Sequence, residues 1–142
     1  MTSVSFDGLN LSHDFGLVLT GVEIGLPEIK SNYINIPEAD GALDLTEALT
    51  GEVHYGNREI KLTYETTAKR SGKSWAELLS AVSTLLHGQR KKIAFDDDPE
   101  WAYLGRCSID AFETSRVHQK MTIVCTCEPY KVWVTDDQQR SL

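Results

Sequence analysis

The sequence predicts a mainly β fold: an antiparallel β-sandwich or open barrel flanked by a single helix over about 74–87. Two patterns support this prediction. Short segments in which apolar and polar residues alternate recur along the chain, and Gly, Pro, Asn and Asp separate them, as in half-buried strands joined by turns. Only one segment has apolar residues at helical spacing between good capping residues.

The N-terminal half is predicted to supply four strands. Residues 4–6 alternate and end at Asp7-Gly8, a turn-forming pair. Residues 17–24 and 31–36 follow, closed by prolines, and residues 60–64 form the clearest alternation of this half.

The helix is predicted from its caps and its apolar stripe. A polar connector over 66–73 leads to Ser74 and Glu77, which fit a capping box, and Gly88 suits a left-handed C-terminal cap. The stripe predicted to face the core comprises Trp75, Leu78, Leu79, Val82, Leu85 and Leu86.

The C-terminal half is predicted to form a series of antiparallel strands. The predicted strands are 91–95, 103–112, 120–126 and a short edge at 132–134, with turns near 96–99 and 114–118. We therefore expect one domain over 1–134, followed by a polar tail over 135–142.

Length and charge exclude several classes. A chain of 142 residues can bury a core without a disulfide or a metal. The formal net charge of −7 disfavours electrostatic capture of nucleic acid or anionic lipid. No apolar run is long enough for a membrane anchor, and the first residues do not resemble a signal peptide, so folding in a reducing cytoplasm is expected.

No metal, cofactor or catalytic site is predicted. Cys125 and Cys127 with His118 lack the second ligand pair of a structural zinc site, so we expect buried, reduced thiols, Cys107 included. Asp96-Asp97-Asp98 is expected to be a solvated loop instead of a Ca²⁺ or Mg²⁺ site. No G-x-S-x-G or H-E-x-x-H motif is present, although paired carboxylates for glycoside cleavage are not excluded by sequence.

Two basic clusters, at 69–73 and 90–92, are the candidates for nucleic-acid contact. They lack interleaved aromatic residues, and the second directly follows the helix, where cations complement the C-terminal dipole. We expect that local role for them.

The segment 40–58 is predicted to be an arm that needs a surface to lie on. Asp40-Gly41 favours a turn, and Leu43 and Leu45 alternate with Asp44. So few apolar residues cannot form a core of their own. The arm is therefore expected either to contact another subunit or to fold back on its own sheet.

Several motifs resemble the N-terminal domain of siphophage distal tail proteins. They are DGALDLTEAL at 40–49, Tyr55-Gly-Asn-Arg58 before a strand, LLHGQRKKIAFDDDPEWAYLGR at 85–106, and Cys127-Glu-Pro-Tyr-Lys131. Their shared order extends the resemblance from about Phe6 to Lys131. Glu38 departs from it, because a glycine is expected there in relatives, so this turn is expected to differ. Many distal tail proteins also continue into a second β domain, and its carbohydrate binding is not carried over.

The resemblance implies a structural protein of the virion, without enzymatic activity. Such proteins form a ring, expected to be a hexamer, at the distal end of the tail tube and join the tube to the tail tip or baseplate. The protein would be assembled in the host cytoplasm, and DNA would pass through the ring without specific binding. The alternatives left open are another component with the tail-tube fold, tube or completion protein, and a small carbohydrate-binding β-sandwich using Trp101 and Trp133.

In the ring, the segment 40–58 is expected to cross onto the neighbouring subunit. The predicted interface residues are Asp40, Gly41, Leu43, Asp44, Leu45, Leu49, Tyr55 and Arg58. The leucines and the tyrosine would make apolar contacts, and Asp44 and Arg58 would make polar ones.

Overall fold

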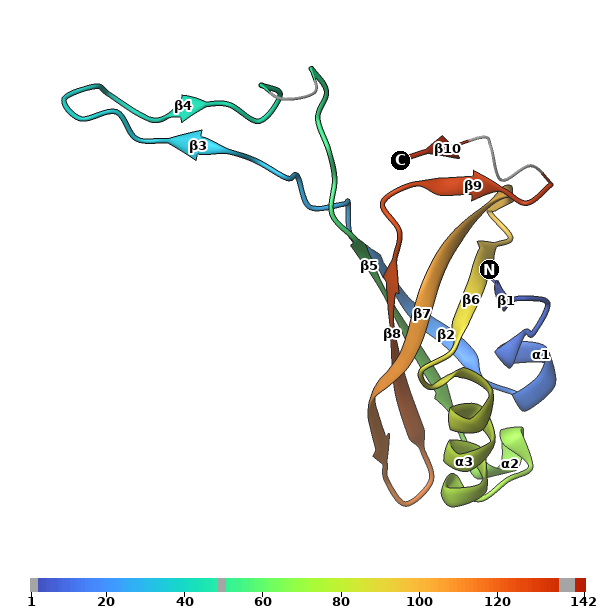
Figure 1. Ribbon diagram of the computed structural model, residues 1–142. Helices are drawn as coiled ribbons and strands as arrows, with labels where there is room; N and C mark the ends of the chain where they lie inside the picture. Colours follow the sequence, from blue (N-terminus) through green and yellow to red (C-terminus); the bar gives the residue numbers. More distant parts are fainter. Residues whose placement is uncertain (1–2, 49–50, 136–139) are drawn as a thin grey trace.

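A curled antiparallel sheet forms a half-barrel with helices against it, which confirms the predicted mainly β, open-barrel class (Figure 1). The computed structural model describes residues 3–48, 51–135 and 140–142. The main sheet has the strand order β1-β6-β7-β8-β5-β2, so β1 and β2 are its two edges. Strand β9 adds to β7, and β10 adds to β9.

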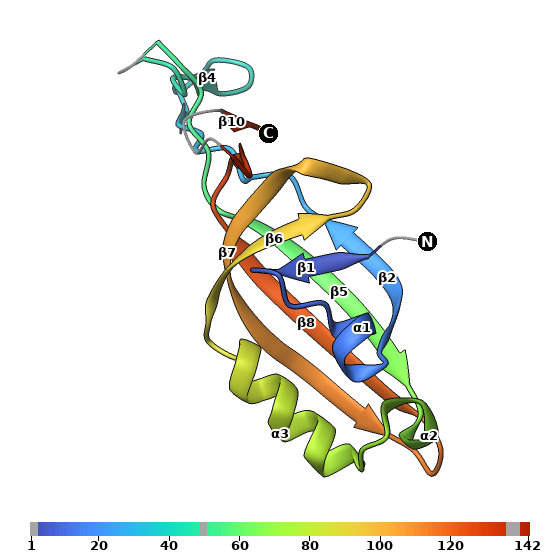
Figure 2. The same cartoon turned by 90° about the vertical axis from the view of Figure 1, so that its right-hand side faces the viewer.

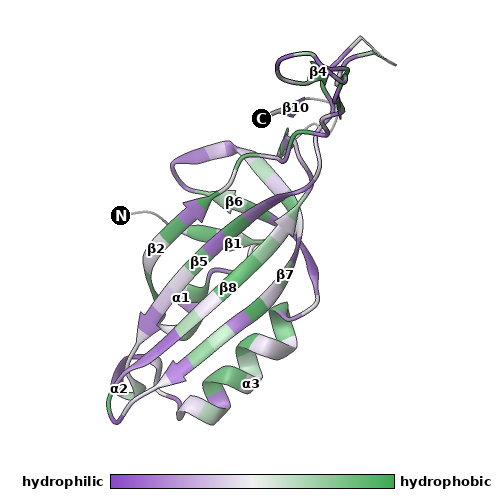
Figure 3. Ribbon diagram, turned by 90° about the vertical axis from the view of Figure 1, so that its left-hand side faces the viewer, coloured by the Kyte–Doolittle hydropathy of each residue, from purple (hydrophilic) through white to green (hydrophobic). Residues whose placement is uncertain are grey.

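Alternation defines the sheet strands, as the sequence predicts. Their bounds are β1 Val4–Phe6, β2 Val18–Ile24, β5 Arg58–Thr66, β6 Arg90–Phe95, β7 Asp98–Thr114, β8 Gln119–Cys127, β9 Lys131–Trp133 and β10 Arg140–Ser141. Every second residue of β5 and β8 is buried. The same alternation is visible as the change between hydrophilic and hydrophobic colours along these strands (Figure 3).

Two boundaries differ from prediction. Asp98 and Pro99 belong to β7 instead of breaking the chain, and the hairpin turn is shorter. Part of the expected polar tail forms β10, whose Arg140 lies opposite Val132 of β9.

Helix α3, Trp75–Leu86, lies at the predicted place and packs against β7. The Ser74 hydroxyl accepts a hydrogen bond from the Glu77 amide at 3.3 Å, which is the predicted N-cap. Leu78, Val82 and Leu86 are buried in the core. The predicted stripe is too wide, however: Trp75 is 51% exposed and Leu85 is 41% exposed, because the helix meets the sheet along a narrow line of residues at every fourth position.

Two further helices were not predicted. Helix α1, Leu11–Phe15, follows β1, and helix α2, Ala68–Ser71, occupies the expected polar connector. Each has a side-chain N-cap, Asn10 and Thr67 respectively. Figure 2 shows α1 and β1 in front of β5 and β8, where Leu11 joins the buried core.

A long arm, residues 26–57, leaves the half-barrel between β2 and β5 (Figure 1). It contains a second sheet of two strands, β3 Tyr33–Ile34 and β4 Leu43–Asp44. The sequence prediction placed 31–36 in the body and began the arm at 40. The arm begins earlier because β3 pairs with β4 and not with the main sheet.

Candidate functional site

The arm presents apolar side chains to solvent. Ile34 lies directly opposite Leu43 in the two-stranded sheet, and these side chains are 46% and 48% exposed. Tyr33 is 61% exposed and Ile36 is 46% exposed. The arm points away from the body (Figure 1) instead of folding back on its own sheet. Exposed apolar side chains that lie side by side, as those of Ile34 and Leu43 do, are typical of a protein-interaction site.

The predicted interface residues are divided between the tip, the strands and the root of the arm. Asp40 and Gly41 lie at the exposed tip, Leu43 and Asp44 form β4, and Leu45 is half-buried, with its amide donating to the Asn32 carbonyl at 2.7 Å. Leu49 lies outside the described residues. Tyr55 lies at the root of the arm, where its backbone forms a β-bridge with Ile29. Its ring meets the Tyr130 ring edge-on, with the two ring centres 6.0 Å apart. Their contact with another subunit stays a prediction.

Arg58 is buried at the root of the arm within its own chain. It is 3% exposed and begins β5. Its guanidinium donates to the carbonyls of Gly25 at 3.0 Å, Pro129 at 3.3 Å and Leu142 at 2.7 Å, and lies 5.1 Å from the centre of the Tyr103 ring. The guanidinium therefore holds together the point where the arm leaves the body.

Asp44 stabilises the arm's own backbone. Its carboxylate accepts hydrogen bonds from the hydroxyl and the amide of Thr46. These bonds, together with one from Tyr33, lower the pKa of Asp44 below its usual value. The carboxylate is therefore engaged within the arm.

The turn at the arm tip has an unusual residue. The Ala39 amide donates to the Ile36 carbonyl at 3.1 Å, Pro37 is the second residue of this turn, and Glu38 has φ 67°. This is the arrangement of a type II turn, whose third position normally requires glycine. The sequence prediction singled out this same position.

Replacing Glu38 with glycine should stabilise the turn by about 1 kcal/mol, because an L side chain is strained at positive φ. Hydrogen exchange of the Ala39 amide, which bonds across the turn, would then slow about fivefold. Ala42→Gly, outside the turn, is the matched control and should not slow it. Unchanged or faster exchange in Glu38→Gly would show that the side chain is not strained.

The arm is also the most acidic part of the chain. Between 26 and 57 there are six Asp and Glu residues and one lysine, so the segment carries a formal charge of −5 out of the chain's −7. Any surface that binds the arm is therefore expected to be basic.

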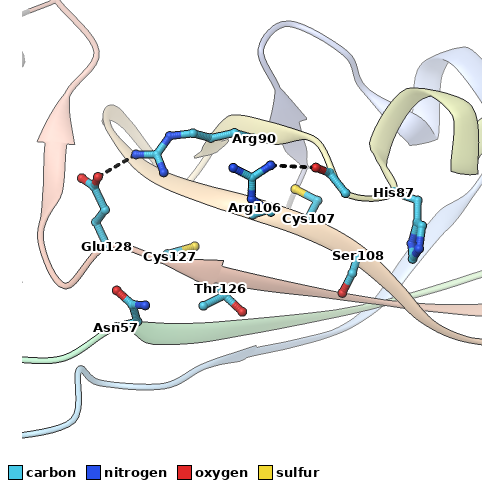
Figure 4. Close-up of a pocket in the computed structure, with 10 residues that line it drawn as sticks. Asn57, His87, Arg90, Arg106, Cys107, Ser108, Thr126, Cys127 and Glu128 are labelled. Atoms are coloured by element: carbon cyan, nitrogen blue, oxygen red, sulfur yellow. Dashed lines mark hydrogen bonds and ion pairs between the residues drawn. The ribbon is translucent and has the colours of Figure 1, made fainter.

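A basic pocket of about 370 Å³ lies on the body, at the end of α3 (Figure 4). Its lining residues are Asn57, His87, Gly88, Arg90, Arg106, Cys107, Ser108, Thr126, Cys127 and Glu128. Arg90 forms an ion pair with Glu128 at 2.6 Å, and Arg106 donates to the Gly88 carbonyl at 2.9 Å.

Sequence reasoning assigned Arg90 only a local role beside the helix and did not single out Arg106. The two arginines are sixteen positions apart in sequence and meet because the β6–β7 register places them directly opposite each other. The register of this hairpin is the one signal that could have revealed the pair.

The three cysteines are free and buried, as predicted. The Cys125 thiol donates to the Cys107 sulfur at 3.5 Å, which lowers the pKa of Cys107 and raises that of Cys125. Burial raises the pKa of Cys127 to about 12. These thiols therefore stay protonated or hydrogen-bonded in the core instead of acting as exposed nucleophiles.

The other chemical candidates are engaged elsewhere. His118 pairs with Glu65 at 3.1 Å, Asp96 accepts from the Ser3 amide at 2.7 Å, and Asp98 pairs with Lys131 at 2.8 Å. Within the described residues no group of three or more His, Cys, Asp or Glu side chains is placed to hold a metal ion. The helices described there are also too short or too polar to cross a membrane.

The two tryptophans considered for sugar stacking contact each other. The Trp101 and Trp133 rings are 5.9 Å apart and tilted by 57°, and the Lys131 ammonium lies 5.6 Å from the centre of the Trp101 ring. Trp133 is 37% exposed. These contacts hold β9 against β7.

The comparison with known proteins is informative at the level of the structure. No protein-family profile matches the chain, and no curated protein sequence matches it. Among solved structures, the chain is similar to SPP1 Dit (gp 19.1), described as a paradigm of the hub adsorption apparatus in phages that infect Gram-positive hosts. The TM-score is 0.73 at 19% sequence identity, over 94% of this chain and 52% of that one.

The chain thus spans about half the length of SPP1 Dit. At this identity the likeness concerns the fold, and it confirms at that level the resemblance read from the sequence motifs. The half-barrel with its flanking helices is therefore similar in fold to about half of SPP1 Dit.

Proposed function

We propose that this protein is a structural component of a phage tail that assembles with copies of itself through the arm. The observation that carries the proposal is an exposed apolar two-stranded arm, without a core of its own, on a body with the fold of a phage hub protein. In the virion the assembly would be a ring, six-membered as in the resembling family, at the distal end of the tail tube. It would join the tube to the tail tip or baseplate.

The shape of the molecule supports a head-to-tail assembly. An arm that leaves one side of the body can bind a different surface on the next copy, and such heterologous contacts close into a ring when the rotation between copies permits. The net charge of −7 suits a ring through which DNA passes, because a negative bore repels phosphate. Assembly in the host cytoplasm agrees with three free thiols.

Replacing Ile34 and Leu43 together with threonine should weaken self-association by about tenfold for each apolar side chain that is replaced. Threonine keeps strand propensity and pairs well across strands, so the two-stranded arm is retained while its apolar surface is removed. Light scattering across a concentration series measures the mass of the assembly, and circular dichroism checks the fold.

Val117→Thr is the matched control, because Val117 is 70% exposed but lies in the turn between β7 and β8, away from the arm. It should assemble like the unmodified protein. The proposal is wrong if the Ile34 and Leu43 double variant retains its fold and assembles as the unmodified protein does.

A further inference from the structure

Two arginines face each other on the outer surface of the sheet. Arg90 of β6 lies directly opposite Arg106 of β7, and both are exposed. Like charges in this position repel each other and destabilise a sheet. Because only one of the two cations has a charged partner among the described residues of the body, the pair suggests a binding role.

The two guanidinium groups are not equally neutralised. Arg90 has Glu128 as its partner at 2.6 Å, whereas the contact of Arg106 within the described residues is the neutral carbonyl of Gly88. A guanidinium has five N–H donors, so Arg106 keeps donors available toward the pocket. Figure 4 shows both arginines at the same pocket, with Ser108, Thr126 and His87 around it.

The pocket has the chemistry of a carboxylate site. Arginine binds carboxylates through two parallel N–H···O bonds, which gives both charge and geometry. His87 accepts a hydrogen bond from the Ile109 amide on Nδ1 at 3.1 Å, so its other nitrogen, Nε2, carries the proton. The described lining therefore includes several donors, and the one carboxylate in it, that of Glu128, is paired with Arg90.

The arm tip supplies matching carboxylates. Glu38 and Asp40 are exposed, and within the described part of the chain neither carboxylate has a hydrogen-bond or ion-pair partner. Asp44, in contrast, is engaged by Thr46. The tip is the part of the arm farthest from its own body (Figure 1), and Glu38 is held there in the left-handed region of φ, a strain that often marks a functional residue.

We propose that Arg90 and Arg106 form the site that receives Glu38 and Asp40 from the arm of a second copy. The inference rests on the proposed self-association and specifies the surface on which the arm docks. The arm tip and the pocket are different surfaces of the chain, so each copy both offers a tip and receives one, as a head-to-tail assembly requires.

The test is the dissociation constant of self-association measured by sedimentation. Arg106→Glu should raise it about tenfold or more, because an attraction becomes a repulsion. Arg116→Glu, in the turn between β7 and β8, changes the net charge identically and should leave it unchanged. Glu38→Gln and Asp40→Asn together, which remove charge but keep size, should weaken association and reduce its sensitivity to salt.

Exchanging the charges of Glu38 and Arg106 tests whether these two residues contact each other across the interface. Glu38→Arg combined with Arg106→Glu should recover at least part of the association that Arg106→Glu loses. If Arg106→Glu behaves like Arg116→Glu while the Ile34 and Leu43 variant is impaired, the arm assembles the protein but does not dock here. No recovery in the combined variant would also overturn the inference, and no effect of any arm variant would overturn the proposed function itself.

Discussion

Arg58→Ala should lower the free energy of unfolding by about 3–5 kcal/mol, because three partly buried hydrogen bonds are lost and the buried guanidinium leaves a cavity. The acceptor carbonyls belong to Gly25, Pro129 and Leu142, and the guanidinium also lies over the Tyr103 ring. Arg58→Lys should have an intermediate effect, since an ammonium group cannot reproduce the planar set of donors. Denaturant unfolding followed by circular dichroism measures both.

The control is Arg106→Ala, which removes an exposed guanidinium and should change stability by less than about 0.5 kcal/mol. A loss below about 1 kcal/mol for Arg58→Ala would show that water replaces the guanidinium at the arm root. A large loss would establish that the root is part of the cooperative fold of the body.

Gly105→Ala should destabilise the sheet by about 3 kcal/mol. Gly105 of β7 lies directly opposite Cys127 of β8, and an added Cβ would lie 2.9 Å from the Thr126 carbonyl oxygen and 3.0 Å from the Cys127 Cα. These are backbone atoms and cannot move aside without separating the strands, so the overpacking is at the costly end of its range. Thermal unfolding measures the loss as a lower Tm.

Gly21→Ala is the matched control on β2. An added Cβ there would meet only the Thr63 side chain, at 3.5 Å, which is ordinary contact. Its effect should be neutral or slightly stabilising, because alanine costs less backbone entropy than glycine in a strand. Equal effects of the two substitutions would show that backbone crowding at Gly105 is relieved by a small shift.

The parts of the fold that follow from periodicity could be predicted from sequence. Strand β8 buries every second residue and α3 begins at its N-cap, so each element carries its own signal. Helices α1 and α2 have about one turn each, which is too short for a periodic pattern. The only sequence signal for these helices is a good N-cap residue followed shortly by a good C-cap residue, such as Asn10 and Gly16 around α1.

The exposure of two apolar residues of α3 shows a second limit on what helical spacing can predict. Trp75 and Leu85 fit the helical spacing but lie beside the line of contact with β7. The spacing predicts which residues share a face, and it does not predict how wide a strip of that face the neighbouring strand covers.

The existence of the arm was predicted, but its extent was not. The shortage of apolar residues for a core pointed to an arm, and the arm exists. Its start at 26, the burial of Arg58 and the meeting of Arg90 with Arg106 all depend on which strands pair and in which register. A sequence specifies these pairings through contacts between distant residues, so a local pattern does not reveal them.

The long excursion between β2 and β5 also has a kinetic consequence for a single copy. Ile24 pairs with Ile60, so the whole arm must be enclosed before these neighbouring strands can join. Closing so large a loop instead of a tight hairpin costs about 2 kcal/mol of chain entropy and slows folding. A single molecule is therefore expected to fold faster when the arm is shortened, so the length of the arm is a kinetic cost that the folding of the body does not require.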